Sequence, residues 1–118
     1  ELTTLPKVGI AYYYGGASTD VLDALALTCK GIVIAGSGSG NYSKKWIEKV
    51  EELVNKGITI VRSSRVGHGI VFESPVFDPK NLTIPSNTLS SQKARILLML
   101  ALSKTNDKQQ INEWFNEY

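Results

Sequence analysis

The chain has 118 residues, which is enough for one hydrophobic core. Its apolar share of 42% and charged share of 20% are those of a globular protein and argue against an intrinsically disordered chain. The net charge is only +2, and the lysines and arginines are scattered without a long run. We therefore expect an ordinary solvated surface and not a nucleic-acid footprint.

The first third of the chain predicts a strand, a helix and a second strand. Residues 7–13 are mostly apolar and are followed by glycines, which favours a strand. Ser18-Thr19-Asp20 is an N-cap cluster for a helix over residues 21–27. The residues expected on the buried face of that helix are Val21, Leu22 and Leu25. The continuous apolar run 31–35 predicts a second, buried strand.

A second helix and a third strand follow. Ser43 is the expected N-cap, and apolar residues then recur at the spacing of one helical face. They are Trp46, Ile47, Val50, Leu53 and Val54. Lys56-Gly57 ends this helix, and the β-branched residues 58–61 predict the third strand. Because a short helix connects each strand to the next, we expect parallel strands with right-handed crossovers.

Residues 62–89 break this alternation. The segment contains Pro75, Pro79 and Pro85, so we expect mostly loop, with a short strand near 69–72 or 82–84. A loop of this length in a compact domain is usually functional or covered by a partner.

Two helices close the chain. Ser90-Ser91 caps a helix from Gln92 to about Lys104 that is apolar nearly all round, which predicts burial on a second side by another domain or subunit. Thr105-Asn106-Asp107 caps a last helix with Ile111, Trp114 and Phe115 on one face. The predicted fold class is α/β: a three-layer α/β/α domain with a small, mainly parallel sheet of about four strands and four helices.

The lone Cys29 and the lone His68 limit the chemistry of the chain. Cys29 cannot form an internal disulfide and is expected to be a small buried residue at the end of a helix. A single histidine without a cysteine partner cannot build a typical zinc site, so we expect no metal. The chain starts with Glu1, without a basic-then-apolar leader or an apolar run long enough to cross a bilayer, so we expect a processed or excised fragment.

The most informative stretch is 35–41, Ala-Gly-Ser-Gly-Ser-Gly-Asn, between a predicted buried strand and a helix. Glycines let backbone amides approach a ligand, and strand ends in α/β sheets bind small molecules. The stretch has no acid, base or strong nucleophile, but the Asn41 amide can donate and accept, so we expect it to hold a ligand. A phosphate-binding loop fits less well, because the glycine spacing differs from the dinucleotide motif and no Gly-Lys-Ser/Thr follows.

Polar residues after the third strand are the next candidates. In Arg62-Ser63-Ser64-Arg65, neither serine has a demonstrable base, so we expect no nucleophile there and one arginine that braces the carboxyl ends of the sheet. Glu73 and Asp78 lie in the long loop, where carboxylates are usually solvated. If Glu73 is functional, it holds an ammonium group or orients another residue.

Three consecutive tyrosines lie at the end of the first predicted strand. By strand alternation Tyr12 and Tyr14 share one face and Tyr13 points to the other. We expect core and interface aromatics, with a tyrosine at a ligand mouth as the alternative.

Five segments, in this order, resemble the C-terminal domain of bacterial type II L-asparaginases. They are Leu-Pro-Lys-Val-Gly-Ile-Ala-Tyr at 5–12, Gly-Ile-Val-Ile-Ala-Gly-Ser-Gly-Ser-Gly-Asn at 31–41, Val-Arg-Ser-Ser-Arg-Val at 61–66, Leu-Ser-Ser-Gln-Lys-Ala-Arg-Ile-Leu-Leu-Met-Leu-Ala-Leu at 89–102 and the ending 111–118. The resemblance covers essentially the whole chain, and the glycine-rich loop combined with the Gln-Lys-Ala-Arg helix start makes it specific.

The resemblance implies hydrolysis of L-asparagine to L-aspartate and ammonia, with weaker glutaminase activity and no metal or organic cofactor. It implies homotetramers built as dimers of dimers and a periplasmic location, with a cytoplasmic one left open. The family's nucleophilic threonine belongs to a larger N-terminal domain whose motifs match no segment here. Residues 1–118 are therefore expected to be a catalytically silent C-terminal domain that completes the site of a neighbouring subunit.

The family's site residues carry over at three positions. Asn41 matches the asparagine that ends the family's loop and is expected to contact the α-amino end of the substrate; Ser39 is expected to support that loop. Glu73 is the candidate for the family's C-domain glutamate, although it lies closer to the Ser-Ser-Arg-Val segment than in the family and the loop differs in sequence. Two alternatives stay open: a stand-alone α/β ligand-binding or regulatory module that binds a phosphate at the glycine-rich loop, and a purely structural dimerisation domain.

Overall fold

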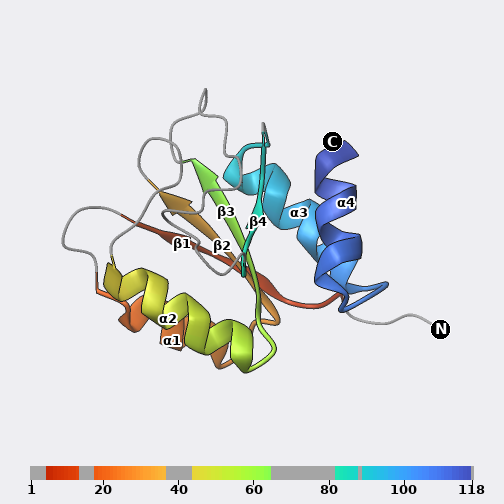
Figure 1. Cartoon of the computed structure of the whole chain (residues 1–118). Coiled ribbons are helices and arrows are strands. Elements are labelled where there is room, and N and C mark those ends of the chain that lie inside the picture. Colours follow the sequence, from red (N-terminus) through yellow and green to blue (C-terminus); the bar gives the residue numbers. More distant parts are fainter. Residues whose placement is uncertain (1–4, 14–17, 37–43, 65–81, 88, 118) are drawn as a thin grey trace.

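The computed structural model describes residues 5–13, 18–36, 44–64, 82–87 and 89–117. The elements in chain order are β1 (Val8–Tyr12), α1 (Asp20–Ala26), β2 (Gly31–Gly36), α2 (Lys44–Asn55), β3 (Thr59–Ser64), β4 (Ile84–Pro85), α3 (Ser91–Leu102) and α4 (Lys108–Glu117). The strands form one parallel sheet in the order β1-β2-β3-β4 (Figure 1). The predicted α/β fold, with four strands and four helices, is confirmed.

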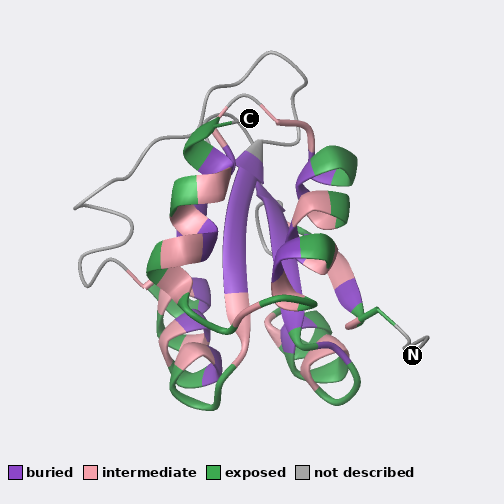
Figure 2. Ribbon diagram, turned by 90° about the vertical axis from the view of Figure 1, so that its right-hand side faces the viewer, coloured by how far each residue is buried: buried purple, intermediate pink, exposed green. Residues whose placement is uncertain are grey.

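The sheet lies between two helical layers, as Figure 2 shows by its buried strands between helices with exposed outer faces. Every residue of β2 is buried, and its side chains alternate between the two layers. Ile32 and Ile34 join the core with α1 and α2, whereas Val33 joins the core with α3 and α4. The continuous apolar run 31–35 is therefore explained by burial on both faces of a parallel sheet.

The buried face of α1 contains fewer of the predicted residues than the sequence indicates. Leu22 is fully buried, Leu25 and Ala26 pack beside it, and Cys29 just beyond the helix is buried as expected. Val21 is 38% exposed, so its predicted place on the buried face is wrong. The helix has only seven residues, and the arc that faces the sheet is the one through positions 22, 25, 26 and 29, which leaves position 21 at its border.

The second helix agrees with its apolar periodicity. Trp46, Val50 and Leu53 are buried, while Lys45, Glu48 and Glu52 are exposed. Gly57 follows with φ of 98°, a backbone conformation that residues with a Cβ rarely adopt, and thus ends the helix as predicted. The predicted N-cap, Ser43, lies outside the described residues.

The third strand is longer than the sequence predicts. The expectation that it ends at Val61 is wrong, because pairing with β2 continues to Gly36 and Ser64. Three polar residues thus occupy strand positions that a hydrophobic pattern does not reveal. The fourth strand lies near the predicted 82–84, at Ile84–Pro85, and its proline is tolerated because β4 is an edge strand. The alternative at 69–72 lies outside the described residues.

The last two helices cover the opposite face of the sheet. Ser90 caps α3, its hydroxyl accepting a hydrogen bond from the Lys93 backbone N–H at 3.2 Å. Ala94, Leu98 and Ala101 are buried, and so are Ile111 and Phe115 of α4. Among the described helices, none combines the length and the apolar character that crossing a membrane requires.

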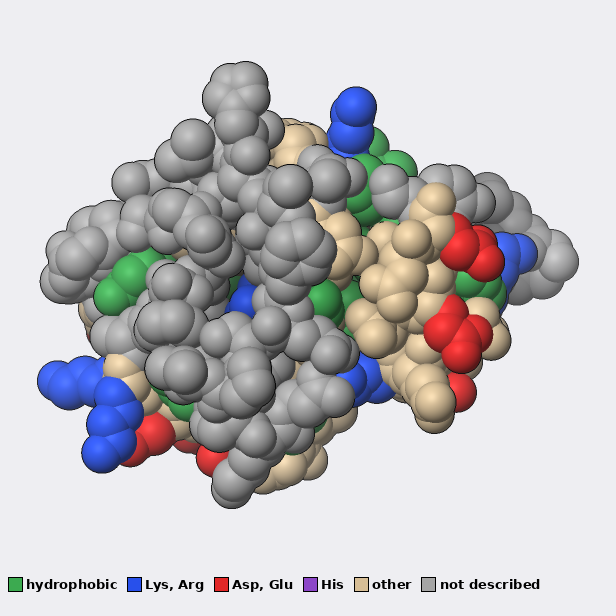
Figure 3. Space-filling model, turned by 45° about the horizontal axis from the view of Figure 1, so that its top comes forward, with side chains coloured by type: hydrophobic (Ala, Val, Ile, Leu, Met, Phe, Trp, Pro, Cys, Tyr) green, Lys and Arg blue, Asp and Glu red, His purple; other side chains and the backbone are tan. Residues whose placement is uncertain are grey.

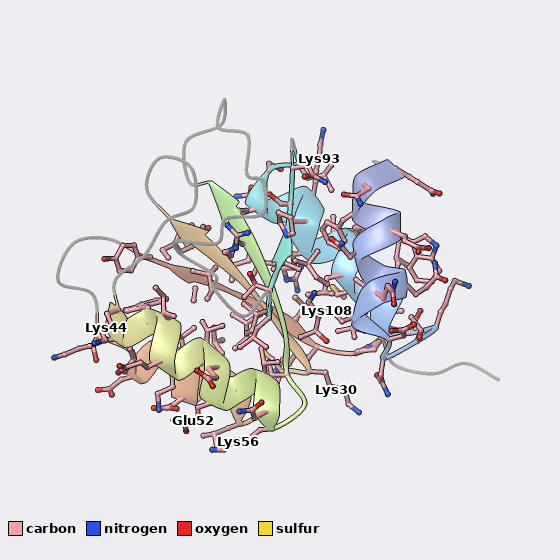
Figure 4. The ribbon with its side chains drawn as sticks, in the orientation of Figure 1. Lys30, Lys44, Glu52, Lys56, Lys93 and Lys108 are labelled. Atoms are coloured by element: carbon pink, nitrogen blue, oxygen red, sulfur yellow. The ribbon has the colours of Figure 1, made fainter. Side chains whose placement is uncertain are left out.

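An ion-pair cluster joins α1 to α2. The Lys49 ammonium lies 3.1 Å from both Asp23 and Glu52, and Lys56 lies 3.3 Å from Glu52. Figure 4 shows Glu52 and Lys56 next to each other on the outer face of α2. Hydrogen bonds from Lys49 and then from Lys56 hold the pKa of Glu52 below its ordinary value, and those to Glu52 and Asp23 raise the pKa of Lys49.

These directions predict a pH-dependent contribution to stability. Because the pKa of Glu52 is lower in the folded state, its contribution is present above about pH 4.5 and is lost as the pH falls through the lowered folded-state pKa. The contribution of Lys49 is present below about pH 10.5 and is lost as the pH rises through its raised pKa. Urea midpoints of the wild type and Glu52→Gln should therefore differ near neutrality and converge in acid.

The difference should be small and should shrink with added salt, because the cluster is exposed. Glu48→Gln, at an exposed position of the same helix, is the matched control. A midpoint difference for Glu52→Gln that persists unchanged in strong acid would contradict this account.

Candidate functional site

The carboxyl ends of the first three strands lie at one edge of the sheet. Tyr12 pairs with Ala35, and Gly36 pairs with Ser64, so the strands end nearly level. Residues 37–43 and 65–81 therefore follow strand ends, Gly36 and Ser64, that are neighbours in the sheet. In open parallel sheets this edge is where ligands bind. Figure 3 brings the top of the molecule forward and shows most of the visible charged side chains near the rim of this view.

The buried polar side chains of the described residues gather toward this edge. All five come from β3, from β4 and its flanking residues, or from the start of α3: they are Arg62, Ser63, Thr83, Ser86 and Ser91. The buried side chains in the rest of the described core are apolar. Buried polar groups require hydrogen-bond partners, so their grouping creates a local network.

The Arg62 guanidinium links β3 to the residues around β4. It is 1% exposed, and its Nε donates to the Thr83 hydroxyl at 2.8 Å. The Arg62 main-chain carbonyl accepts a hydrogen bond from the Ser86 backbone N–H, also at 2.8 Å. This geometry agrees with the expectation that one arginine of the Arg-Ser-Ser-Arg segment braces the carboxyl ends of the sheet.

The Ser63 hydroxyl links β3 to α3. Its Oγ lies 2.8 Å from the Oγ of Ser91, and both residues are buried. A second hydroxyl cannot act as the general base that a serine nucleophile needs, and His68 lies outside the described residues, so the expectation that Ser63 is not a nucleophile stays a prediction. Ser91 was expected only as part of a helix cap.

Of the tyrosines at the end of β1, Tyr13 packs on the side of the sheet that α2 covers. The ring of Tyr13 packs edge-on against Trp46, with 5.1 Å between ring centroids and an interplanar angle of 73°. Its backbone N–H donates to Ala35, which keeps β1 and β2 paired to their ends. Tyr12 is 46% exposed, and Tyr14 lies outside the described residues.

The residues predicted to bind a ligand lie outside the described part of the chain. They are Asn41, Ser39 and Glu73, together with the other polar candidates His68 and Asp78. Their described neighbours in the chain, Gly36 and Ser64 at the strand ends and Lys44 at the start of α2, come from the carboxyl edge or lead back from it. Lys93, exposed on the first turn of α3, adds a positive charge at the same end of the molecule (Figure 4).

Comparison with known proteins identifies the family. The model of the glutaminase/asparaginase C-terminal domain matches residues 7–115. This chain belongs to the glutaminase/asparaginase C-terminal domain family.

Relatives of this C-terminal domain match along the whole chain. The chain is 47% identical to L-asparaginase 2 of Bacillus subtilis and 45% identical to L-asparaginase 2 of Escherichia coli, in each case over all of its length. It spans 32% and 34% of those two relatives, about a third of their length. The crystal structure of a probable cytoplasmic L-asparaginase from Campylobacter jejuni superposes with a TM-score of 0.90 and 45% identity, covering the whole of this chain and 39% of the other.

The hydroxyl pair of this glutaminase/asparaginase domain yields a stability prediction. Ser63→Ala or Ser91→Ala removes one hydroxyl and leaves the other buried without that partner, at a cost of about 1–3 kcal/mol in unfolding free energy. The double variant should lose less unfolding free energy than the two single variants lose together, because it leaves no buried hydroxyl without its partner. Urea denaturation of the three variants measures this coupling.

Ser103→Ala is the matched control, since Ser103 is exposed at the other end of α3 and hydrogen-bonds the Leu100 carbonyl. Strict additivity of the two buried substitutions would show that the hydroxyls do not depend on each other.

Proposed function

We propose that this domain is the C-terminal part of an L-asparaginase that hydrolyses L-asparagine to L-aspartate and ammonia. The proposal rests on 47% identity along the entire chain to a relative named L-asparaginase 2. Because the chain spans only about a third of such relatives, we propose that the nucleophilic threonine belongs to an N-terminal domain and that residues 1–118 bind substrate without cleaving it. A threonine hydroxyl can attack the amide carbon, release ammonia and leave an ester that water hydrolyses; these steps need proton transfers but no oxidant or reductant, so we propose no metal or organic cofactor.

The proposed substrate contacts follow from the charges of an amino acid. An asparagine substrate carries an ammonium and a carboxylate, which need acceptors and donors, respectively. The Asn41 amide oxygen and the Glu73 carboxylate can accept from the ammonium, and neither can attack an amide; Ser39 would support the loop that carries Asn41. Such residues orient the substrate and stabilise charge for chemistry carried out by other groups.

The described geometry supports this division of roles. The segments that contain Asn41 and Glu73 leave the sheet from Gly36 and Ser64, which are register partners in neighbouring strands. Within the part of the chain that the structure describes, the Ser63 hydroxyl at the same edge is paired with the Ser91 hydroxyl. The carboxyl edge is thus suited to present polar groups to a small ligand rather than to activate a nucleophile.

We further propose that the domain acts in a homotetramer, a dimer of dimers, in which it closes the site of a neighbouring subunit. Two large apolar residues of α3, Ile96 and Leu100, are 54% and 48% exposed. A groove of about 310 Å³ lies beside them, lined by Leu97, Leu100, Ala101, Lys104 and Trp114. An apolar surface of this kind is typical of contact with another domain or subunit.

The names of the relatives support a proposal for a second substrate and for the cellular location. Several relatives are named glutaminase-asparaginases, so we propose glutamine as a second, weaker substrate. One relative's name includes "periplasmic" and the Campylobacter structure is called cytoplasmic; we propose export to the periplasm, as in the type II enzymes that the sequence resembles.

The role of Asn41 can be tested in the full-length enzyme. Asn41→Ala should weaken substrate binding by about 1–3 kcal/mol, because a hydrogen bond to a charged group is lost. Steady-state ammonia release should show this as a raised KM for L-asparagine. Asn55→Ala, at the exposed end of α2, is the control and should leave both kinetic constants unchanged. Unaltered KM and kcat in Asn41→Ala would remove this residue from the site.

The isolated chain should release no ammonia from L-asparagine above background, because it would lack the nucleophile. Calorimetry with nucleotides and with asparagine separates this proposal from a phosphate-binding module. Turnover by residues 1–118 alone, or tight nucleotide binding, would contradict it.

A further inference from the structure

We propose that Thr83 and Ser91 are positioning residues for substrate binding: through Arg62 and Ser63 they fix the end of β3 against the residues at β4 and against the start of α3. The inference rests on the proposed function, since the substrate contacts are expected in the segments that follow the ends of β2 and β3. Neither hydroxyl is proposed to touch the substrate, and both are buried.

The hydrogen bond from Arg62 to Thr83 is important because the backbone ladder between β3 and β4 is short. Only two residue pairs join β3 to β4, Val61 with Ile84 and Arg62 with Pro85, and a proline has no N–H to donate. The Ser86 N–H to the Arg62 carbonyl is one link, and the Arg62 Nε to the Thr83 hydroxyl is another. Hydrogen bonds depend on distance and angle, whereas apolar packing is non-directional, so these links fix where β4 lies along β3.

The bond to Ser91 attaches the same strand end to the opposite layer. Ser91 is the first residue of α3, directly after the capping Ser90, so the Ser63 hydroxyl meets a helix start that is itself fixed. The helix is held on β1 by the Arg95 Nε, which donates to the Val8 carbonyl at 2.8 Å. Three hydrogen bonds therefore connect β4, β3, α3 and β1 in one series.

The end of β3 held in this way precedes the segment that contains Glu73, and it pairs with the end of β2, which precedes the segment that contains Asn41. Ser63 pairs with Ala35, and the next pair, Ser64 with Gly36, is the last one in the register of β2 and β3. A displacement of about 1 Å in a positioning element can reduce catalytic efficiency about a hundredfold. Loss of a buried hydroxyl at this edge should therefore affect the kinetics of a protein that is still folded.

The test uses two substitutions of Thr83 in the full-length enzyme. Thr83→Val keeps the shape and removes the hydroxyl, so kcat/KM for L-asparagine should fall about ten- to a hundredfold. Thr83→Ser keeps the hydroxyl and loses a methyl group, so kcat/KM should stay within about twofold of the wild type. Thr105→Val is the control, because the Thr105 hydroxyl accepts from the Asp107 N–H outside the buried cluster, and its kinetics should not change.

Activity is expressed per folded molecule, from circular dichroism at the assay temperature. A merely structural role would leave kcat/KM of the folded fraction unchanged in Thr83→Val, and that result would overturn the inference. An equal loss in Thr83→Ser would overturn it too, because the hydroxyl would not be the cause. If Thr83→Val does not fold, Ser91→Ala takes its place with Ser103→Ala as its control, and an unchanged kcat/KM of the folded fraction in Ser91→Ala would then overturn the inference.

These experiments distinguish a failure of the proposed function from a failure of the positioning role. A wild-type protein that releases no ammonia, or an Asn41→Ala variant with normal kinetics, would refute the substrate role before any Thr83 variant is assayed. An active, Asn41-dependent enzyme with a fully active Thr83→Val would refute only the positioning role.

Discussion

The buried guanidinium of Arg62 is the constraint on which the arrangement of the carboxyl edge depends. Removing a charged group from water costs several kcal/mol, and the cost is offset only where hydrogen bonds satisfy the group. The Thr83 hydroxyl provides one such bond, and the main chain of the same arginine binds Ser86. The two-residue strand β4 therefore has a defined place beside β3, although its own ladder is short and contains a proline.

Helices and strands with a clear hydrophobic pattern were predicted correctly from the sequence. The helical period of α2, with Trp46 and Val50 inward, and the apolar run of β2 each specify one structure. The prediction fails where the periodicity is short or the buried residues are polar. Val21 lies at the border of the buried face of a two-turn helix, and so short a helix has too few residues for its periodicity to fix that border. Arg62 to Ser64 belong to β3 because β2 offers hydrogen bonds up to Gly36, which their own side chains do not reveal.

The candidate site was only partly predictable for a related reason. The sequence pointed to the strand end before the glycine-rich segment, since strand–glycine–helix transitions have a known geometry, and the sheet does end there. The buried polar network was missed because its partners are 21 and 28 residues apart in the chain. No spacing rule connects such residues, and only the tertiary fold brings them together. The roles of Asn41, Ser39 and Glu73 came from resemblance to a family and remain predictions.

The helices on the two faces of the sheet carry different groups of residues on their outer surfaces, although large apolar residues are exposed on both sides. Outside α1 and α2, Lys49 bridges Asp23 and Glu52, as on a face in contact with water. Outside α3, Ile96 and Leu100 are about half exposed beside an apolar groove. Because large apolar residues in a row on a solvated helix are unfavourable, Ile96 and Leu100 support the proposed contact of α3 with a neighbouring domain or subunit. The Ser63–Ser91 hydrogen bond joins the start of this helix to β3.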